Sequence, residues 1–239
     1  MMLALFLWLA TPAWSDVVAR IDRGAATSDA ELLRGAIADC DALASEASAT
    51  PRARELARYG PAYAEWRLAF LPGVQSGETT KVLAAAQANL RAVIAAHAES
   101  AEAHALLAAV LGSMIRAGAD PMTTGQDAQH ELDEALRLEP NNPRVRLEEG
   151  MNAFFVPAEY GGGIGKAEAS LRQAVALLER EPRNRPWPNW GGFDAHVWLG
   201  QVLVKRGDKA AAKQEYEAAL TFWPQSGWVK YVLLPALDR

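Results

Sequence analysis

The segment YGGGIGK, from Tyr160 to Lys166, is the first place in this sequence where residue types and spacing could do chemistry. Glycine-rich backbone before a helix can bind phosphate through its N–H groups. A Walker-type phosphate loop needs a glycine where this segment has Tyr160, and a serine or threonine where Ala167 follows the lysine. We therefore expect a long turn between two helices here, because glycine clusters are first of all turn signals.

Aromatic residues crowd the C-terminal quarter and are interleaved with proline and glycine in PWPNWGG, from Pro186 to Gly192. Tryptophans in such a loop can stack on a sugar, a quinone-like ring or a peptide. The alternative is that Trp187 and Trp190 pack the loop onto neighbouring helices, since buried aromatics contribute to protein cores more often than to ligand sites. The candidate residues for binding a ligand or partner are Asn152, Phe155, Tyr160, Trp187, Trp190 and His196.

Histidines and carboxylates also gather upstream, but their spacing does not fit a metal site. His97 and His104 could share a face only on one continuous helix, and Ser100 is expected to begin a new helix between them. Zinc sites have closer histidine pairs with a third ligand, so solvated helix faces explain these residues, and no metal or cofactor is expected. His196 falls at the start of a predicted helix, where it could touch a ligand or only cap and pack.

No arrangement of a nucleophile with its base is found in the sequence. It has no G-x-S-x-G elbow, no H-E-x-x-H and no paired cysteine and histidine. Its single cysteine, Cys40, lies between Asp39 and Asp41, whose charges would raise the thiol pKa. Glu148 and Glu149 are adjacent and must point apart on a helix. We therefore expect a protein without catalytic activity.

The elements that must position these residues are helices, and residues 193–226 show their pattern most clearly. Apolar residues recur on nearly one face of two successive segments. Asp208 is expected to cap the second helix and Pro224 to end it. Gly200, with other small residues, would let the two helices approach, while Tyr216 fills the space between them. One such hairpin cannot bury its own apolar face, so neighbours must stack on it.

Two upstream units repeat this pattern. Ala128, Leu132, Ala135 and Pro140 match the second helix, and Leu111–Gly112 matches Leu199–Gly200 in the first. A middle unit has Leu171 in its second helix and Gly150 as the small residue of its first. The units are stretched at 119–126 and 156–165, and the insertion 183–192 separates the last two. Residues 99–226 resemble the tetratricopeptide repeat (TPR) family in three units, 99–142, 143–182 and 193–226.

This resemblance implies an all-α fold of antiparallel helix hairpins, stacked as a TPR-like right-handed solenoid. Residues 16–98 would form a helical region with a degenerate repeat, and 227–239 a capping segment. The implied function is a scaffold that binds a protein or peptide partner in the concave groove and along the long loops. The alternative is a small-molecule binding component, or an enzyme, whose pocket is formed by the aromatic loops. A weaker similarity extends to the exported TPR subunits of bacterial solute transporters.

The first 15 residues predict a signal peptide. Met1 to Ala10 is almost wholly apolar, Ala13 and Ser15 provide the small residues before a cleavage point, and we expect cleavage after Ser15. No basic residue precedes the apolar run, so either the signal is atypical or its true start lies upstream. A short buried helix or an uncleaved anchor is the alternative to a signal peptide. The mature protein would be periplasmic or secreted, with no membrane span. The net charge of −5 and the absence of basic runs argue against a nucleic-acid partner.

Overall fold

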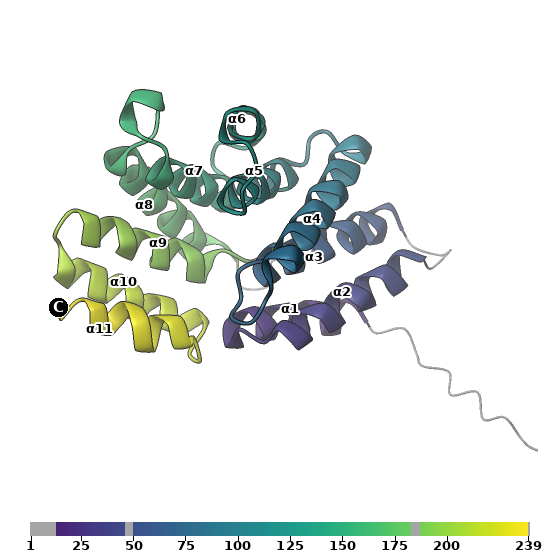
Figure 1. The fold of residues 1–239 in the computed structure, drawn as a ribbon, viewed down its shortest axis with the longest axis horizontal. Coiled ribbons are helices and arrows are strands. Elements are labelled where there is room, and N and C mark those ends of the chain that lie inside the picture. Colours follow the sequence, from purple (N-terminus) through teal and green to yellow (C-terminus); the bar gives the residue numbers. More distant parts are fainter. Residues whose placement is uncertain (1–12, 46–49, 183–186, 239) are drawn as a thin grey trace, which may run out of the picture.

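The computed structural model describes residues 13–45, 50–182 and 187–238, and in these ranges it contains helices and no strands. Figure 1 shows them as successive antiparallel hairpins. The long helices are α1 (Trp14–Thr27), α2 (Ala30–Ser45), α3 (Pro51–Leu68), α4 (Ser76–Ala96), α5 (Ala101–Arg116), α6 (Pro121–Leu138), α7 (Pro143–Phe155), α8 (Ile164–Arg180), α9 (Gly192–Lys205) and α10 (Lys209–Phe222). Short turns are η1 (Ala158–Tyr160), η2 (Val229–Leu233) and α11 (Leu234–Ala236).

Glycines on the first helix of two hairpins let the partner helix approach closely. A Cβ added at Gly200 would lie 2.3 Å from the Tyr216 ring, and one at Gly150 would lie 2.5 Å from Leu171 Cγ. Both distances are too short for any larger residue. The sequence prediction that small residues close the α7–α8 and α9–α10 hairpins is therefore confirmed.

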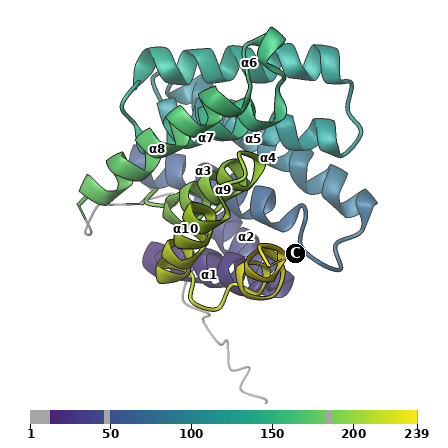
Figure 2. The same ribbon diagram turned by 90° about the vertical axis from the view of Figure 1, so that its left-hand side faces the viewer.

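The N-terminal half folds back onto the segment before α9, so the first helices do not line an open groove along their whole length. Trp190 stacks on Tyr63 of α3 with ring centroids 5.0 Å apart. Arg67 of α3 donates hydrogen bonds to Asp194 of α9, one of them 2.9 Å long. In both Figure 1 and Figure 2 the C-terminal helices curl back toward α1.

One expected loop is helical in the structure. The sequence predicts a stretched connection at 119–126, but α6 already begins at Pro121. The Asp120 side chain accepts hydrogen bonds from both the backbone N–H and the hydroxyl of Thr123, and Pro121 at the first helical position suits a helix start. The insertion thus adds length to α6 instead of forming a loop.

The two ends of the described chain both contribute to the core. Trp14, inside the expected signal segment, begins α1 and packs edge-on against Trp187 with ring centroids 5.4 Å apart. The rest of the apolar run, residues 1–12, lies outside the described residues. In the predicted cap, Val229, Leu233 and Leu237 are buried. No helix in the described ranges has both the length and the apolar composition to cross a membrane.

Candidate functional site

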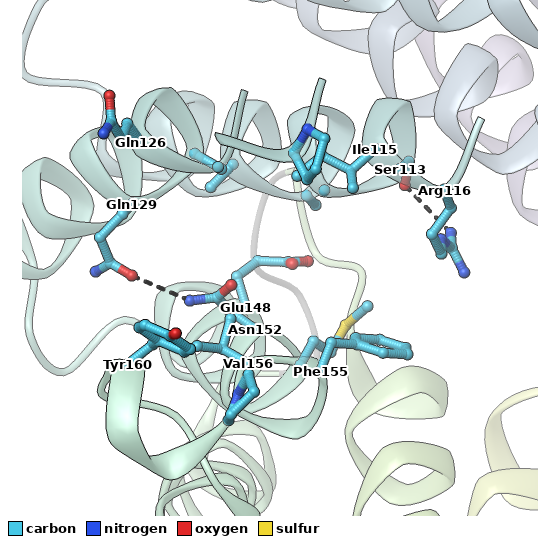
Figure 3. A pocket seen from close by; sticks show the side chains of 18 of the residues that line it. Ser113, Ile115, Arg116, Gln126, Gln129, Glu148, Asn152, Phe155, Val156 and Tyr160 are labelled. Atoms are coloured by element: carbon cyan, nitrogen blue, oxygen red, sulfur yellow. Dashed lines mark hydrogen bonds between the residues drawn. The ribbon is translucent and has the colours of Figure 1, made fainter. Parts of the chain in front are cut away.

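A pocket of about 950 Å³ lies between α5, α6 and α7, at the edge where the hairpins turn. Its lining is mostly apolar, with a few polar side chains that point inward (Figure 3). The size falls within the usual range for small-molecule sites. The residues of the pocket on which the following argument depends are Gly112, Arg116, Met122, Gln129, Glu148, Met151, Asn152, Phe155, Tyr160 and Trp198.

The pocket exists because α6 lies against α5 but contacts α7 much less than α8 contacts α9. Gly112, which the sequence pattern aligned with Gly200, does not close a helix pair. Nothing lies within 4 Å of a Cβ added there, and the residue lines the pocket. Gly112 therefore matches Gly200 in the repeat pattern but differs from it in role, because this glycine faces the cavity.

Three of the sequence candidates line this pocket together. Asn152 donates a hydrogen bond to the Gln129 side chain across it at 3.3 Å, as Figure 3 shows. Phe155, at the end of α7, packs edge-on against Trp198 of α9 with centroids 5.4 Å apart. Tyr160 lies on the short turn η1 and is 76 % exposed. Met122 of α6 is 72 % exposed at the same pocket. These exposed apolar groups form a mouth open to solvent.

Arg116 supplies the positive charge of the pocket. Its guanidinium lies over the Phe70 ring, with 4.2 Å between Cζ and the ring centroid, and donates a hydrogen bond to Ser113 at 3.3 Å. Burial lowers the pKa of Arg116 from its ordinary value, though such a group stays charged. A guanidinium held in this way can meet a carboxylate on a bound molecule.

Glu148 is a deeply buried carboxyl group of the pocket. Its side chain is 3 % exposed and extends from α7 into the middle of the cavity. Its Oε1 atom is buried and has no hydrogen-bond partner. Glu149, its neighbour, turns away and accepts hydrogen bonds from Ser170 at 2.9 Å and Arg146 at 2.8 Å. The prediction that the two carboxylates point apart is confirmed.

Trp187 and Trp190 do not line this pocket, because they are buried against α1 and α3. Trp190 is 5 % exposed and donates a hydrogen bond from Nε1 to Tyr59 at 3.0 Å. Trp187 packs edge-on against Tyr59 with centroids 5.2 Å apart. Gly191 follows them with a φ of +112°, which brings the backbone against Leu147 of α7. This segment thus fills part of the inner face that the TPR resemblance assigns to a groove.

His196 also lies away from the pocket. Its Nδ1 pairs with Glu215 of α10 at 2.7 Å, and its ring lies near Phe222, so the side chain joins the two helices of its hairpin.

The position of His104 differs from the sequence prediction of a solvated helix face. It is buried, with Nδ1 2.6 Å from Glu131 and Nε2 3.2 Å from the Ala98 carbonyl, and is not on a solvated face. Among the described residues, no group of histidine, cysteine and carboxylate side chains could hold a metal ion.

The glycine-rich segment forms a tight turn. Gly161 and Gly163 have φ values of +87° and +100°, and a Cβ on Gly162 would lie 2.1 Å from the Val156 carbonyl oxygen. Lys166 donates to the Gly161 carbonyl at 3.1 Å, so the lysine closes its own turn instead of facing an anion. The turn places η1, and with it Tyr160, at the pocket mouth.

The polar groups Glu148 and Arg116 were missed as site residues by reasoning from sequence. Glu148 and Asn152 are spaced i, i+4 and so share one face of α7, which is a signal that could have linked Glu148 to the candidate Asn152. Nothing in the sequence indicated that α6 would lie apart from α7. The match of Gly112 to Gly200 in the repeat pattern gave no sign that Gly112 lines a pocket.

Comparisons with solved structures identify the fold. No family model and no curated protein matches the sequence. The HusA haemophore from Porphyromonas gingivalis is similar, with a TM-score of 0.64 and 21 % identity, over 81 % of this chain and 94 % of that one. A thermophilic TPR protein from Thermus thermophilus has a TM-score of 0.58 and 18 % identity, over 93 % of this chain and 98 % of that one. The chain therefore has the TPR-like, all-α helical-repeat fold that its sequence predicted.

Proposed function

We propose that this protein is a binding scaffold that holds a small, largely apolar molecule in the pocket between α5, α6 and α7. The observation that carries the proposal is the pocket itself, about 950 Å³ of mostly apolar lining that ends at a buried carboxyl group. Ligand sites are typically concave and apolar, with a few polar groups that fix orientation. The proposal assigns no catalytic step to the protein.

The similar fold of a haemophore supports a flat, apolar ring as one ligand class to test. Met122 and Met151 offer thioether groups and Tyr160 a phenol, while Arg116 could meet a carboxylate. Thioether and phenol groups can ligate haem iron, so haem is the first natural molecule to test. A hydrocarbon probe without iron or charge, 2-ethylnaphthalene, tests the apolar pocket alone.

The test is to fill the pocket without disturbing the core. Gly112→Phe places a ring in open space, because nothing lies within 4 Å of the added Cβ. Gly77→Phe is the matched control, since Gly77 is a helical glycine of α4 that also faces open space and lies outside the pocket. We expect Gly112→Phe to abolish calorimetric binding of haem or 2-ethylnaphthalene and Gly77→Phe to preserve it. Binding that survives Gly112→Phe, or no binding of either probe by the unaltered protein, would contradict the proposal.

A protein or peptide partner is the second candidate, and the exposure of Met122, Phe155 and Tyr160 at the pocket mouth favours it. Exposed apolar side chains around a pocket can receive an apolar side chain of a peptide. Such a partner would cover the pocket mouth, so Tyr160→Ser would weaken partner binding and leave 2-ethylnaphthalene binding within about threefold.

We also propose that the protein is exported from the cytoplasm, which the apolar run Met1 to Ala10 supports.

A further inference from the structure

Glu148 combines two properties that a buried side chain rarely has together. Its Oε1 atom has no hydrogen-bond partner, and the side chain extends into a cavity that a small molecule could fill. Buried polar groups are almost always hydrogen-bonded, and leaving one unpaired destabilises a protein. The adjacent Glu149 shows the usual arrangement, with hydrogen bonds from Ser170 and Arg146. Glu148 is therefore placed to act on whatever fills the pocket.

The surroundings of Glu148 favour the protonated form of its carboxyl group. Burial raises the pKa well above its ordinary value, the charge of Asp194 on α9 raises it further, and Arg67 on α3 lowers it. Arg67 is already paired with Asp194, so its charge is largely neutralised. Arg116 on α5 is the remaining charged residue of the pocket. Both the burial and the nearby Asp194 thus favour the protonated form of Glu148, which can donate a hydrogen bond as well as accept one.

A cationic ligand fits the pocket less well. Arg116 already places a positive charge there, with its Cζ 6.0 Å from the centre of the Phe155 ring. Lys205 lies 4.7 Å from the centre of the Phe154 ring, which packs against Phe155. Aromatic rings attract cations through their faces, and these rings already have cationic neighbours. A second cation would be repelled by Arg116 and would first have to ionise Glu148.

We infer that the pocket selects ligands that carry a hydrogen-bond acceptor, such as a ketone or quinone carbonyl, and that the Glu148 carboxylic acid donates to this group. The inference rests on the proposed binding function and adds the chemical class of the ligand. The apolar walls hold the ring or chain, and the buried Glu148 carboxyl group orients it. A hydrogen bond formed away from water favours the carbonyl compound over its hydrocarbon analogue by about tenfold.

Three probes of nearly the same shape test this inference: 2-acetylnaphthalene, 2-ethylnaphthalene and 1-(naphthalen-2-yl)ethylamine. We expect the ketone to bind about tenfold more tightly than the hydrocarbon, with its carbonyl stretching band shifted to lower frequency. Glu148→Leu should remove both the preference and the shift. Glu148→Gln keeps an N–H donor and should retain them. Glu149→Gln is the control and should bind the three probes as the unaltered protein does.

The effect of pH gives a second readout. The ketone preference of the unaltered protein should fall as Glu148 ionises at high pH, because a carboxylate cannot donate, whereas that of Glu148→Gln should not change. Equal binding of ketone and hydrocarbon would overturn the inference while the proposed function stands. Tightest binding of the amine, lost in Glu148→Gln, would also overturn it and indicate a cation site. Failure of all three probes to bind would contradict the proposed function itself.

Discussion

The indole nitrogen of Trp190 donates a hydrogen bond to the phenolic oxygen of Tyr59 at 3.0 Å, which ties the segment before α9 to α3. Tyr63 stacks on the same indole ring, and Trp66 lies against it. The two halves of the chain therefore share one core. The tryptophan-rich segment before α9, which could have been a binding loop, fills part of the inner face of the repeat stack.

Truncation of Trp190 should destabilise the whole fold. We expect Trp190→Ala to lower the free energy of unfolding by about 3–5 kcal/mol, because it removes a buried ring and its hydrogen bond. Trp228, which is exposed, provides the control: Trp228→Ala should change stability by less than about 1 kcal/mol. Urea unfolding measures both. Equal, small effects would show that Trp190 is not part of the core.

The ion pair between Arg67 and Asp194 should be sensitive to the loss of one partner. Burial works to lower the pKa of Arg67, but the charge of Asp194 raises it above its ordinary value. Asp194→Asn removes the hydrogen-bonded counter-charge of this buried guanidinium, and we expect a loss of about 3 kcal/mol in unfolding free energy. The surface pair Arg137 and Glu134 is the comparison, where Glu134→Gln should have a much smaller effect on stability. The prediction fails if the two variants melt alike.

Stability should rise as the pH falls from about 7 toward about 5. Burial raises the pKa of Glu65 from 4.5 to about 7, so the folded protein keeps a proton that the unfolded chain has released. Between these values the folded state binds more protons, and its stability therefore decreases with increasing pH. For Glu65 the effect is on the order of 2–3 kcal/mol.

Glu65→Gln isolates this contribution. The amide stays neutral at all pH values, so the variant should lose less stability than the unaltered protein between pH 5 and pH 8. The comparison is between two series of chemical unfolding curves. Parallel pH profiles for the two proteins would mean that Glu65 is ionised in the folded state.

The N-terminus of the mature protein provides a further prediction. Cleavage after Ser15 would remove Trp14 and its edge-on contact with Trp187. An aromatic pair of this kind contributes about 0.5–1.5 kcal/mol, so the shortened chain should still fold. Intact-mass measurement of the exported protein should give Asp16 as its first residue. Recovery of a chain that retains Met1 would rule out cleavage.

Much of the fold follows from residues whose role depends only on their neighbours along the chain. The Gly200–Tyr216 and Gly150–Leu171 contacts follow from helix spacing and side-chain size, and both are present. Asp208 caps α10 as expected, accepting a hydrogen bond from the Ala211 N–H at 2.9 Å. Burial of Cys40 raises its pKa to about 12, with Asp41 and Asp39 adding to the effect, in the direction that its sequence neighbours indicated.

The site was harder to predict because it depends on how hairpins are placed relative to one another. Gly112 has the same local pattern as Gly200, yet it faces a cavity because α6 contacts α7 little. The role of Glu148 depends on Asp194 and Arg67, which come from other helices. Trp187 and Trp190 could be core or site by composition alone, and only their contacts with α1 and α3 distinguish the two.

The most direct measurement is a crystal structure of the protein with 2-ethylnaphthalene bound. Ligand binding in the pocket between α5, α6 and α7 predicts electron density for the ring beside Gly112, Met151 and Phe155, in contact with Glu148. Density for the probe on the exposed C-terminal residues Phe222, Trp228 and Tyr231, with none between these three helices, would contradict it.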